Sequence, residues 1–231
     1  MHSDMHPDRD RFRMNDPPSI LSTDNGREGL RSKSFLGLLL TQLLTAINDN
    51  VFRWLVIGVG KDFVSTESVS NILMAGTACF VLPYLLLAAP AGYLADRYSK
   101  RTVILGCKIA EIFIMALGTI ALVLGNLWLL FAAVGLMGAQ SALFSPAKLG
   151  SVPELLRPDR ISLANALFGL TTVVATVVGM AVGSWLSQIT GFRGHEHWEW
   201  SGITLLSIAV TGTLLSLLIR PVPAANPGRT F

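Results

Sequence analysis

The sequence predicts an all-α membrane protein with six transmembrane helices. Its 231 residues are 51% hydrophobic and only 14% charged, whereas an average soluble domain is roughly 25% charged. Several uncharged or nearly uncharged runs, such as residues 71–91, reach the ~20 residues that a helix needs to cross ~30 Å of hydrocarbon. Short polar segments separate these runs, as expected for turns between membrane helices.

The predicted membrane orientation of all the helices depends on one charged turn. The segment Gly92-Tyr-Leu-Ala-Asp-Arg-Tyr-Ser-Lys-Arg101 has three cations, one carboxylate and a helix-breaking glycine. It follows the uncharged run 71–91 and precedes residues 102–125, which carry only Lys108 and Glu111 as charges. A basic turn between two membrane-length segments indicates a tight hairpin on the cytoplasmic side.

Residues 1–33 are expected to form a disordered cytoplasmic tail. They are polar, with three prolines and six Arg or Lys residues, and they lack the apolar core and small-residue cleavage site of a signal peptide. Their arginines either contact lipid headgroups or only hold the N-terminus inside. A second cytoplasmic tail is expected over 221–231, after a membrane domain over 34–220.

The six helices within this domain are expected over residues 35–60, 71–95, 102–124, 127–145, 161–189 and 200–218. Pro83 and Pro90 are expected to kink the second helix, which membrane helices tolerate. Pro146 disfavours helical geometry for Ser145, so it is expected to end or bend the fourth helix. Residues 147–160 then form a polar connection at the cytoplasmic surface.

The distribution of loop cations sets the orientation. The first tail has six, the 92–101 turn three, the 147–160 connection three and the chain after the sixth helix two. The intervening loops hold Lys61, none and Arg193. Because cytoplasmic loops carry an excess of Lys and Arg, this alternation predicts that both termini are cytoplasmic.

The first helix carries the main candidate site. Gln42, Thr45, Asp49 and Arg53 are spaced by three, four and four residues, which places them on one stripe of a helix. Asp49 lies about 21 Å along the helix from Phe35, within the hydrocarbon. Ionisable groups at this depth are costly and therefore functional candidates.

The charges of this helix have two interpretations. Asp49 and Arg53 can partly neutralise each other as an i,i+4 pair, while Asn48 and Asn50 flank the stripe. Either these groups bind a transported molecule, or they form a buried polar network that only joins helices.

Two further helices carry polar faces. Lys108 and Glu111 form an i,i+3 pair in the third helix, and both a structural and a functional role remain open. One face of the fifth helix carries Asn165, Thr172, Thr176, Gly179 and Gly183. The Gly-x-x-x-Gly interval favours close helix packing, although the same face could border a pathway.

The sequence lacks the patterns of several other classes. The segment His195-Glu196-His197-Trp198-Glu199 is not His-Glu-x-x-His and lies in an expected loop, so a solvated loop is preferred to a metal site. The sequence has no Gly-x-Ser-x-Gly or phosphate-binding glycine loop, and no histidine falls in an expected membrane helix. A net charge of +3 is too small to suggest nucleic acid. We therefore expect no enzyme, metal or cofactor.

Three stretches resemble a known family. The pattern Gly92-x-Leu94-x-Asp96-Arg97-x-Ser99-Lys100-Arg101 resembles the signature between helices 2 and 3 of major facilitator superfamily transporters, with Ser99 in place of a usual glycine. Residues 46–53 (Ala-Ile-Asn-Asp-Asn-Val-Phe-Arg), and Pro146-Ala-Lys148 followed by Pro153-Glu154-Leu155, are similar to its lysophospholipid transporter branch. Some members of that branch are fused to an acyltransferase and an acyl-carrier-protein synthetase. The resemblance covers about residues 34–220.

The resemblance implies the N-terminal six-helix half of a twelve-helix transporter, built from two inverted three-helix repeats, with its site near the midplane. The chain would then be a fragment, or pair with itself or another six-helix chain. The implied gate residues are Gly92, Asp96, Arg97, Lys100 and Arg101.

The implied activity is lysophospholipid translocation across the inner membrane by alternating access. The first-helix polar residues would meet the headgroup, with Lys108 and Glu111 nearby. One alternative is a facilitator or exporter of a drug or small metabolite. Another is a non-transporting membrane module that anchors or regulates a fused or neighbouring acyltransferase.

Overall fold

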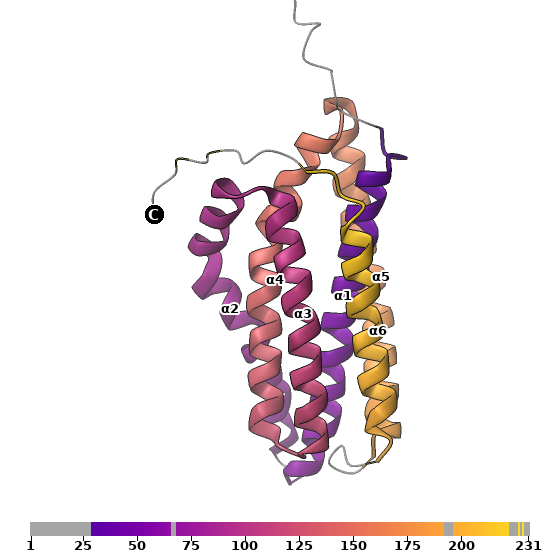
Figure 1. The fold of residues 1–231 in the computed structure, drawn as a ribbon. Coiled ribbons are helices and arrows are strands. Elements are labelled where there is room, and N and C mark those ends of the chain that lie inside the picture. Colours follow the sequence, from indigo (N-terminus) through magenta and orange to yellow (C-terminus); the bar gives the residue numbers. More distant parts are fainter. Residues whose placement is uncertain (1–28, 66–67, 192–195, 222–225, 227, 229–231) are drawn as a thin grey trace, which may run out of the picture.

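The computed structural model describes residues 29–65, 68–191, 196–221, 226 and 228. This part of the chain is an up-and-down bundle of long helices (Figure 1). The α-helices are α1 (Lys33–Gly60), α2 (Val69–Arg97), α3 (Lys100–Val123), α4 (Leu127–Leu155), α5 (Ile161–Ile189) and α6 (Trp198–Ser216), with short 3₁₀ turns at η2 (Lys61–Phe63) and η4 (Pro158–Arg160). Nearly all of the expected N-terminal tail, most of the C-terminal tail, and His195 lie outside the described residues.

The helices have the length and composition of membrane spans. Five of those described are long and apolar enough to cross a bilayer, namely α1 to α5. The sixth, α6, has 19 residues and falls outside this group, although it packs against α3 and α1. The all-helical architecture with six helices is therefore confirmed, while the crossing of the membrane by α6 stays a prediction.

The two ends of the bundle differ in their aromatic residues. The start of α1, the α2–α3 turn, the α4–α5 link and the end of α6 lie at one end, which is uppermost in Figure 1. At the other end, exposed tryptophans are found at the start of α4, the end of α5 and the start of α6: Trp128, Trp185, Trp198 and Trp200. Tryptophan prefers the boundary between hydrocarbon and water, so a membrane surface lies near this lower end.

Side-chain caps begin two of the helices. Ser32 accepts a hydrogen bond from the backbone N–H of Phe35 at 3.2 Å, at the start of α1. Asn126 accepts one from Leu129 at 3.0 Å, at the start of α4. Gly125 takes the left-handed conformation, with φ of 57°, which permits the short turn between α3 and α4. The turn has three residues, 124–126, where the sequence predicted two.

The fourth helix is longer than the sequence analysis expected. It continues through Pro146 and Pro153 to Leu155, so the expected end at Ser145 is wrong. A proline removes only one backbone donor, and neighbouring helices can compensate for this in a membrane protein. The residues predicted as the start of a polar connection, including Lys148, are therefore helical.

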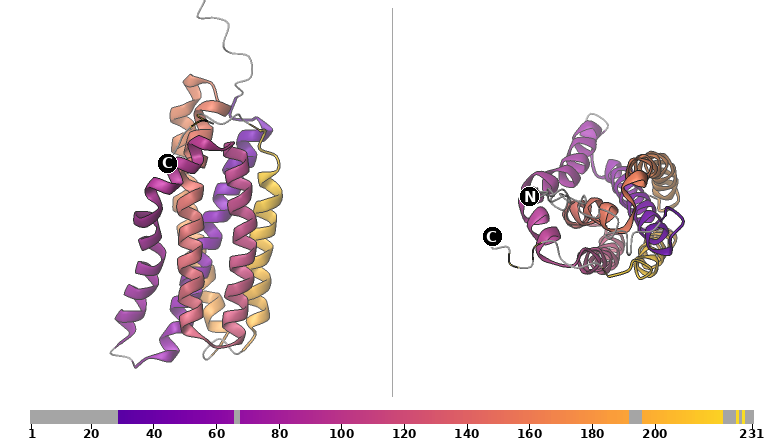
Figure 2. Two further views of the ribbon diagram at one scale, coloured as in Figure 1. Left: turned by 60° about the vertical axis from the view of Figure 1, so that its left-hand side comes forward. Right: turned by 90° about the horizontal axis from the view of Figure 1, so that it is seen from above.

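The first helix is the centre of the bundle, because it contacts α2, α4, α5 and α6 (Figure 2). Two glycines of α5 allow its closest approach. A Cβ atom at Gly179 would lie 2.4 Å from the Cβ of Asn50, and one at Gly183 would lie 2.4 Å from the carbonyl oxygen of Val51. The packing role predicted for the Gly-x-x-x-Gly interval is confirmed.

Candidate functional site

A cavity of about 300 Å³ opens between α1, α2, α4 and α5. We call it the central cavity. Its walls are Gln42, Thr45, Ala46, Asp49, Asn50 and Arg53 of α1, Phe80 and Tyr84 of α2, Ser141, Phe144, Ser145 and Lys148 of α4, and Thr172 and Thr176 of α5. The stripe predicted on the first helix thus faces this cavity, as does part of the predicted polar face of the fifth. Helices α3 and α6 contribute none of these residues.

Asp49 is the acidic group of the cavity. It is only 6% exposed, and its Oδ2 accepts a hydrogen bond from Ser141 at 2.5 Å. Its other oxygen, Oδ1, is buried and has no hydrogen-bond partner among the described residues. An unsatisfied buried carboxylate oxygen is costly, so it is a strong acceptor for a ligand that brings a donor into the cavity.

Arg53 contacts its neighbours differently from the prediction. Within the described part of the chain it makes no ion pair with Asp49. Its guanidinium instead donates to Asn50 Oδ1 at 2.8 Å and lies 5.2 Å from the centre of the Phe80 ring. This amide and this ring hold the cation without neutralising it, so its positive charge stays available to an anion.

Lys148 is the cavity residue whose place the sequence analysis missed. Its ammonium group donates to Gln42 Oε1 at 2.9 Å and lies 5.7 Å from the centre of the Phe168 ring. Gln42 in turn donates to Thr172 Oγ1 at 3.3 Å. Lys148 therefore links α4 to α1, and Gln42 extends this hydrogen-bond network to α5.

A helical spacing could have located Lys148. Ser141, Phe144, Ser145 and Lys148 follow the i, i+3, i+4, i+7 pattern of one helix face, and all four line the central cavity. Pro146 interrupts this pattern in the sequence, although the helix continues through it.

The central cavity therefore holds one carboxylate and two cations. None of Asp49, Arg53 and Lys148 takes part in an ion pair with another described residue; each is held by neutral donors, acceptors or rings. Opposite charges in one partly desolvated space suit a molecule that itself carries both an anion and a cation.

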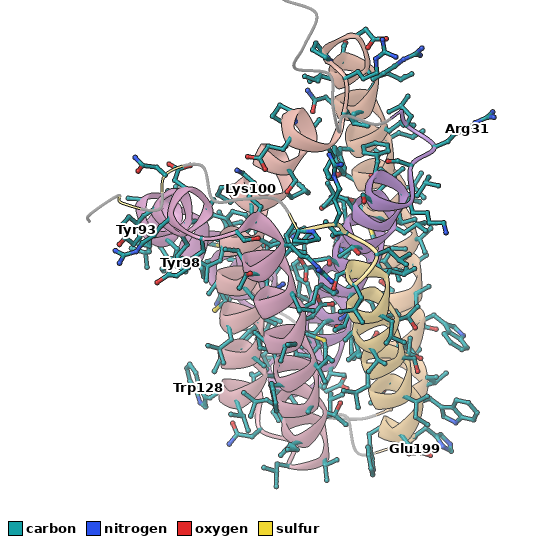
Figure 3. The ribbon with its side chains drawn as sticks, turned by 45° about the horizontal axis from the view of Figure 1, so that its top comes forward. Arg31, Tyr93, Tyr98, Lys100, Trp128 and Glu199 are labelled. Carbon is teal, nitrogen blue, oxygen red and sulfur yellow. The ribbon has the colours of Figure 1, made fainter. Side chains whose placement is uncertain are left out.

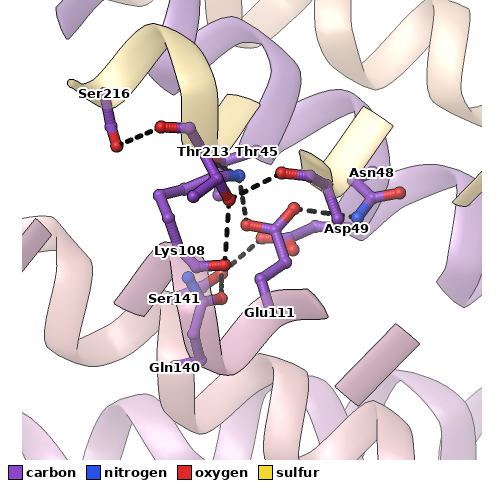
Figure 4. Close-up of polar contacts among 10 residues, drawn as sticks. Thr45, Asn48, Asp49, Lys108, Glu111, Gln140, Ser141, Thr213 and Ser216 are labelled. Carbon is purple, nitrogen blue, oxygen red and sulfur yellow. Dashed lines mark hydrogen bonds and ion pairs between the residues drawn. The ribbon is translucent and has the colours of Figure 1, made fainter. Parts of the chain in front are cut away.

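Lys108 and Glu111 do not line this cavity. They lie in a second polar cluster, close to Asp49 and Ser141 (Figure 4). They form the ion pair that their spacing predicts, and both side chains are 0% exposed. Asn48 donates to Glu111 at 2.8 Å, and Lys108 donates to Thr45 at 3.0 Å. This buried cluster joins α3 to α1, and Thr45 is the predicted site residue that belongs to both places.

The predicted 92–101 turn is mainly helical, because α2 continues through Gly92 to Arg97 and α3 begins at Lys100. Only Tyr98 and Ser99 lie between the two helices, and this junction is attached to the end of α4. Lys100 is 5% exposed and pairs with Glu154, whose carbonyl oxygen also accepts from Arg220 at 3.2 Å. The charged turn and the predicted 146–154 motif are thus brought together. Figure 3 shows Lys100 here, beside the end of α2 that carries Tyr93 and Tyr98.

The other residues predicted for a gate lie around this contact. Arg97 donates to the Tyr93 hydroxyl, and Arg101 donates to the carbonyl oxygen of Leu217 at 3.3 Å. The carbonyl oxygen of Asp96 accepts from the Asn226 backbone at 2.9 Å. Gly92 has open space around it, since a Cβ there would meet no atom within 4 Å.

Comparisons with known proteins match this arrangement. The sequence pattern of the Major Facilitator Superfamily matches residues 38–230. Proteins named lysophospholipid transporter LplT are similar to this chain: 27% identical over 206 residues in Cronobacter sakazakii, covering 87% of this chain and 47% of that protein. In Photorhabdus laumondii the identity is 33% over 159 residues, covering 69% of this chain and 38% of the relative.

The chain spans about half the length of the curated relatives it matches. The family match covers most of α1 and all of α2 to α6, and the helices that line the central cavity are long and apolar enough to cross a bilayer. This chain is therefore an integral membrane protein that belongs to the major facilitator superfamily, a family of transporters rather than enzymes.

Proposed function

We propose that this protein forms one half of a secondary transporter that moves a lysophospholipid across the inner membrane by alternating access. The observation that carries the proposal is the central cavity, in which Asp49, Arg53 and Lys148 surround about 300 Å³ without an ion pair among themselves. The relatives named lysophospholipid transporters support the substrate class.

The headgroup chemistry follows from these charges. A lysophosphatidylethanolamine headgroup has an anionic phosphate and a cationic ammonium group. Arg53 and Lys148 would bind the phosphate through charge-assisted hydrogen bonds, and the ammonium group would donate to Asp49 Oδ1, which lacks a partner among the described residues. These contacts replace the hydrogen bonds to water that the phosphate and ammonium groups lose when the headgroup enters the cavity.

The remaining wall comes from a second set of six helices. These would belong either to a longer chain or to another six-helix chain, and the substrate would be held between the halves near the midplane. The contact between the 92–101 turn and the end of α4, through Lys100 and Glu154, would bias one access state against the other. In this proposal α6 also crosses the membrane, and both termini are cytoplasmic.

The test is uptake of lysophosphatidylethanolamine into vesicles that contain the protein encoded by the whole gene. Loss of a charge-assisted hydrogen bond costs about 1.5–3 kcal/mol, so Asp49→Ala and Arg53→Ala should each slow uptake about 10- to 100-fold. Leu40→Ala is the matched control, because Leu40 lies on the same helix, 40% exposed, outside the cavity. Wild-type rates for both charge variants would refute the proposal.

A second candidate rests on the rings in the same cavity. Phe80, Tyr84 and Phe144 line it, and aromatic rings attract organic cations, so a drug or metabolite facilitator is the competing function. Uptake that is indifferent to the phospholipid headgroup would favour it. The third alternative is a non-transporting membrane module that anchors or regulates an acyltransferase. In that case, neutralising Asp49, Asp96 and Glu111 together should leave phospholipid acylation by that enzyme unchanged.

A further inference from the structure

A second cavity, of about 510 Å³, lies between α1 and α5 at the end of the bundle that carries the exposed tryptophans. We call it the interfacial cavity. It is lined by Trp54, Ile57, Gly58, Lys61, Asp62, Ser184, Ser187, Gln188 and Gly191, and it shares none of these with the central cavity. The proposed transport role therefore does not account for it.

Two facing helical stripes form its walls. Trp54, Ile57 and Gly58 share one face of α1, and Ser184, Ser187 and Gln188 share one face of α5. Lys61 begins the η2 turn, and Gly191 follows the end of α5. The wall from α5 is polar, with two serines and a glutamine. It provides hydroxyl and amide groups along one side of the cavity.

Gly58 lets the serine wall approach closely. A Cβ atom at Gly58 would lie 2.2 Å from the hydroxyl oxygen of Ser187. That hydroxyl donates to the Ser184 carbonyl at 2.7 Å, which leaves its oxygen available as an acceptor.

Trp54 gives the cavity an unused donor. Its indole Nε1–H is buried and has no hydrogen-bond partner among the described residues. A buried donor without an acceptor costs about 1–3 kcal/mol. Trp54 lines the cavity, so an acceptor that enters there would recover this cost once the ring turns its N–H toward it.

The position and charge of the cavity indicate the chemistry of its ligand. Trp128, Trp185, Trp198 and Trp200 are exposed at this end, at the depth where lipid headgroups are found. Lys61 is exposed beside the cavity and Asp62 is next to it, so the wall carries both signs of charge. A zwitterionic group suits this wall better than an anionic one.

We propose that the interfacial cavity binds the headgroup of an intact zwitterionic bilayer phospholipid such as phosphatidylethanolamine. Lys61 and the Trp54 indole N–H bind its phosphate and ester oxygens, and the serine hydroxyls and Asp62 face its ammonium group. The acyl chains remain in the bilayer, along the exposed apolar surface of α5. The bound lipid stabilises the contact between α1 and α5, independently of transport through the central cavity.

The test is thermal unfolding of the purified full-length protein in detergent, with phosphatidylethanolamine, phosphatidylglycerol or free O-phosphoethanolamine added. Ligand that binds only the folded state raises the midpoint. We expect phosphatidylethanolamine to raise the unfolding midpoint most. In Trp54→Phe and in Lys61→Met this rise should fall to less than half of its wild-type size. Trp185→Phe, an exposed indole at the same end outside the cavity lining, should keep the full rise.

Three results would overturn the proposal: an equal or larger rise with phosphatidylglycerol, a full rise in both cavity variants, or an equal rise with free O-phosphoethanolamine. If Trp54→Phe folds poorly, the test depends on Lys61→Met alone. Lys61 is exposed on the η2 turn, so this substitution should not disturb folding. Asp49→Ala should keep the lipid-induced rise while losing uptake, so failure of this proposal is distinguishable from failure of the transport proposal.

Discussion

Lys108 and Glu111 are fully buried, and among the described residues they pair with each other and form hydrogen bonds with Thr45 and Asn48. Removing one member of such a pair leaves an uncompensated buried charge, whereas removing both does not. Lys108→Met or Glu111→Leu alone should lower the free energy of unfolding by about 3–5 kcal/mol, and the double variant by clearly less. Chemical unfolding in detergent measures this difference.

The same variants separate structure from transport. Single variants that unfold like wild type but no longer take up lysophospholipid would assign this pair to the pathway instead of the scaffold.

Lys148 differs from the buried Lys108 because its ammonium group lines a cavity that a ligand can enter. Its ammonium group is hydrogen-bonded to Gln42 and lines the central cavity, where the proposed phosphate binds. Lys148→Met should slow lysophospholipid uptake about 10-fold or more, because a charge-assisted hydrogen bond is lost. Lys148→Arg should retain more activity, and Lys33→Met, at the exposed start of α1, should leave uptake unchanged. Equal rates for Lys148→Met and Lys33→Met would remove Lys148 from the substrate site.

Among the elements, α1 and α5 approach each other through glycine. A side chain at Gly183 would collide with the backbone of Val51, and backbone cannot move aside as a flexible side chain can. Gly183→Val should therefore lower the free energy of unfolding by about 1–3 kcal/mol. Gly169→Val is the control on the same helix, since a Cβ at Gly169 meets nothing within 4 Å. Similar stability of the two variants would contradict the close packing.

At the level of the helices, the features that follow helical periodicity could be predicted from the sequence. The stripe from Gln42 to Arg53 and the Gly179–Gly183 interval follow helical spacing, and the structure places both on contact-making faces. The extension of α4 past Ser145 was missed because a proline usually ends a helix in water, although neighbouring helices can compensate for it in a membrane protein. The helical spacing from Ser141 to Lys148 was the signal in the sequence that α4 continues. The partner of Arg53 could not be predicted either, since side-chain rotamers decide between Asn50 and Asp49.

At the scale of the molecule, the described chain begins and ends at the same end of the bundle, together with the 92–101 turn (Figure 1). The count of loop cations predicts that this end is cytoplasmic. In a variant in which Ala replaces Cys79 and Cys107, a single cysteine at Tyr98 should react with an impermeant maleimide only from the cytoplasmic side. A cysteine at Glu199 should react only from the opposite side. The reverse pattern would contradict the orientation.

The sequence predicted the order and number of helices because each is a long, mainly apolar run bounded by polar or charged residues. It could not predict which polar groups share a space. The separation of Asp49, in the central cavity, from Glu111, in the closed cluster, depends on how α3 and α4 pack around α1. One sequence stripe thus contributes to two sites.

The central claim is that the cargo's headgroup occupies the cavity beside Asp49, Arg53 and Lys148. Its most direct test is substrate protection of Thr176→Cys, which lines that cavity, against Val177→Cys, which is 57% exposed on the outside of the same helix. Both variants carry the Cys79→Ala and Cys107→Ala changes. Lysophosphatidylethanolamine should slow maleimide labelling at position 176 and leave position 177 unchanged; equal labelling of position 176 with and without saturating substrate would contradict the account.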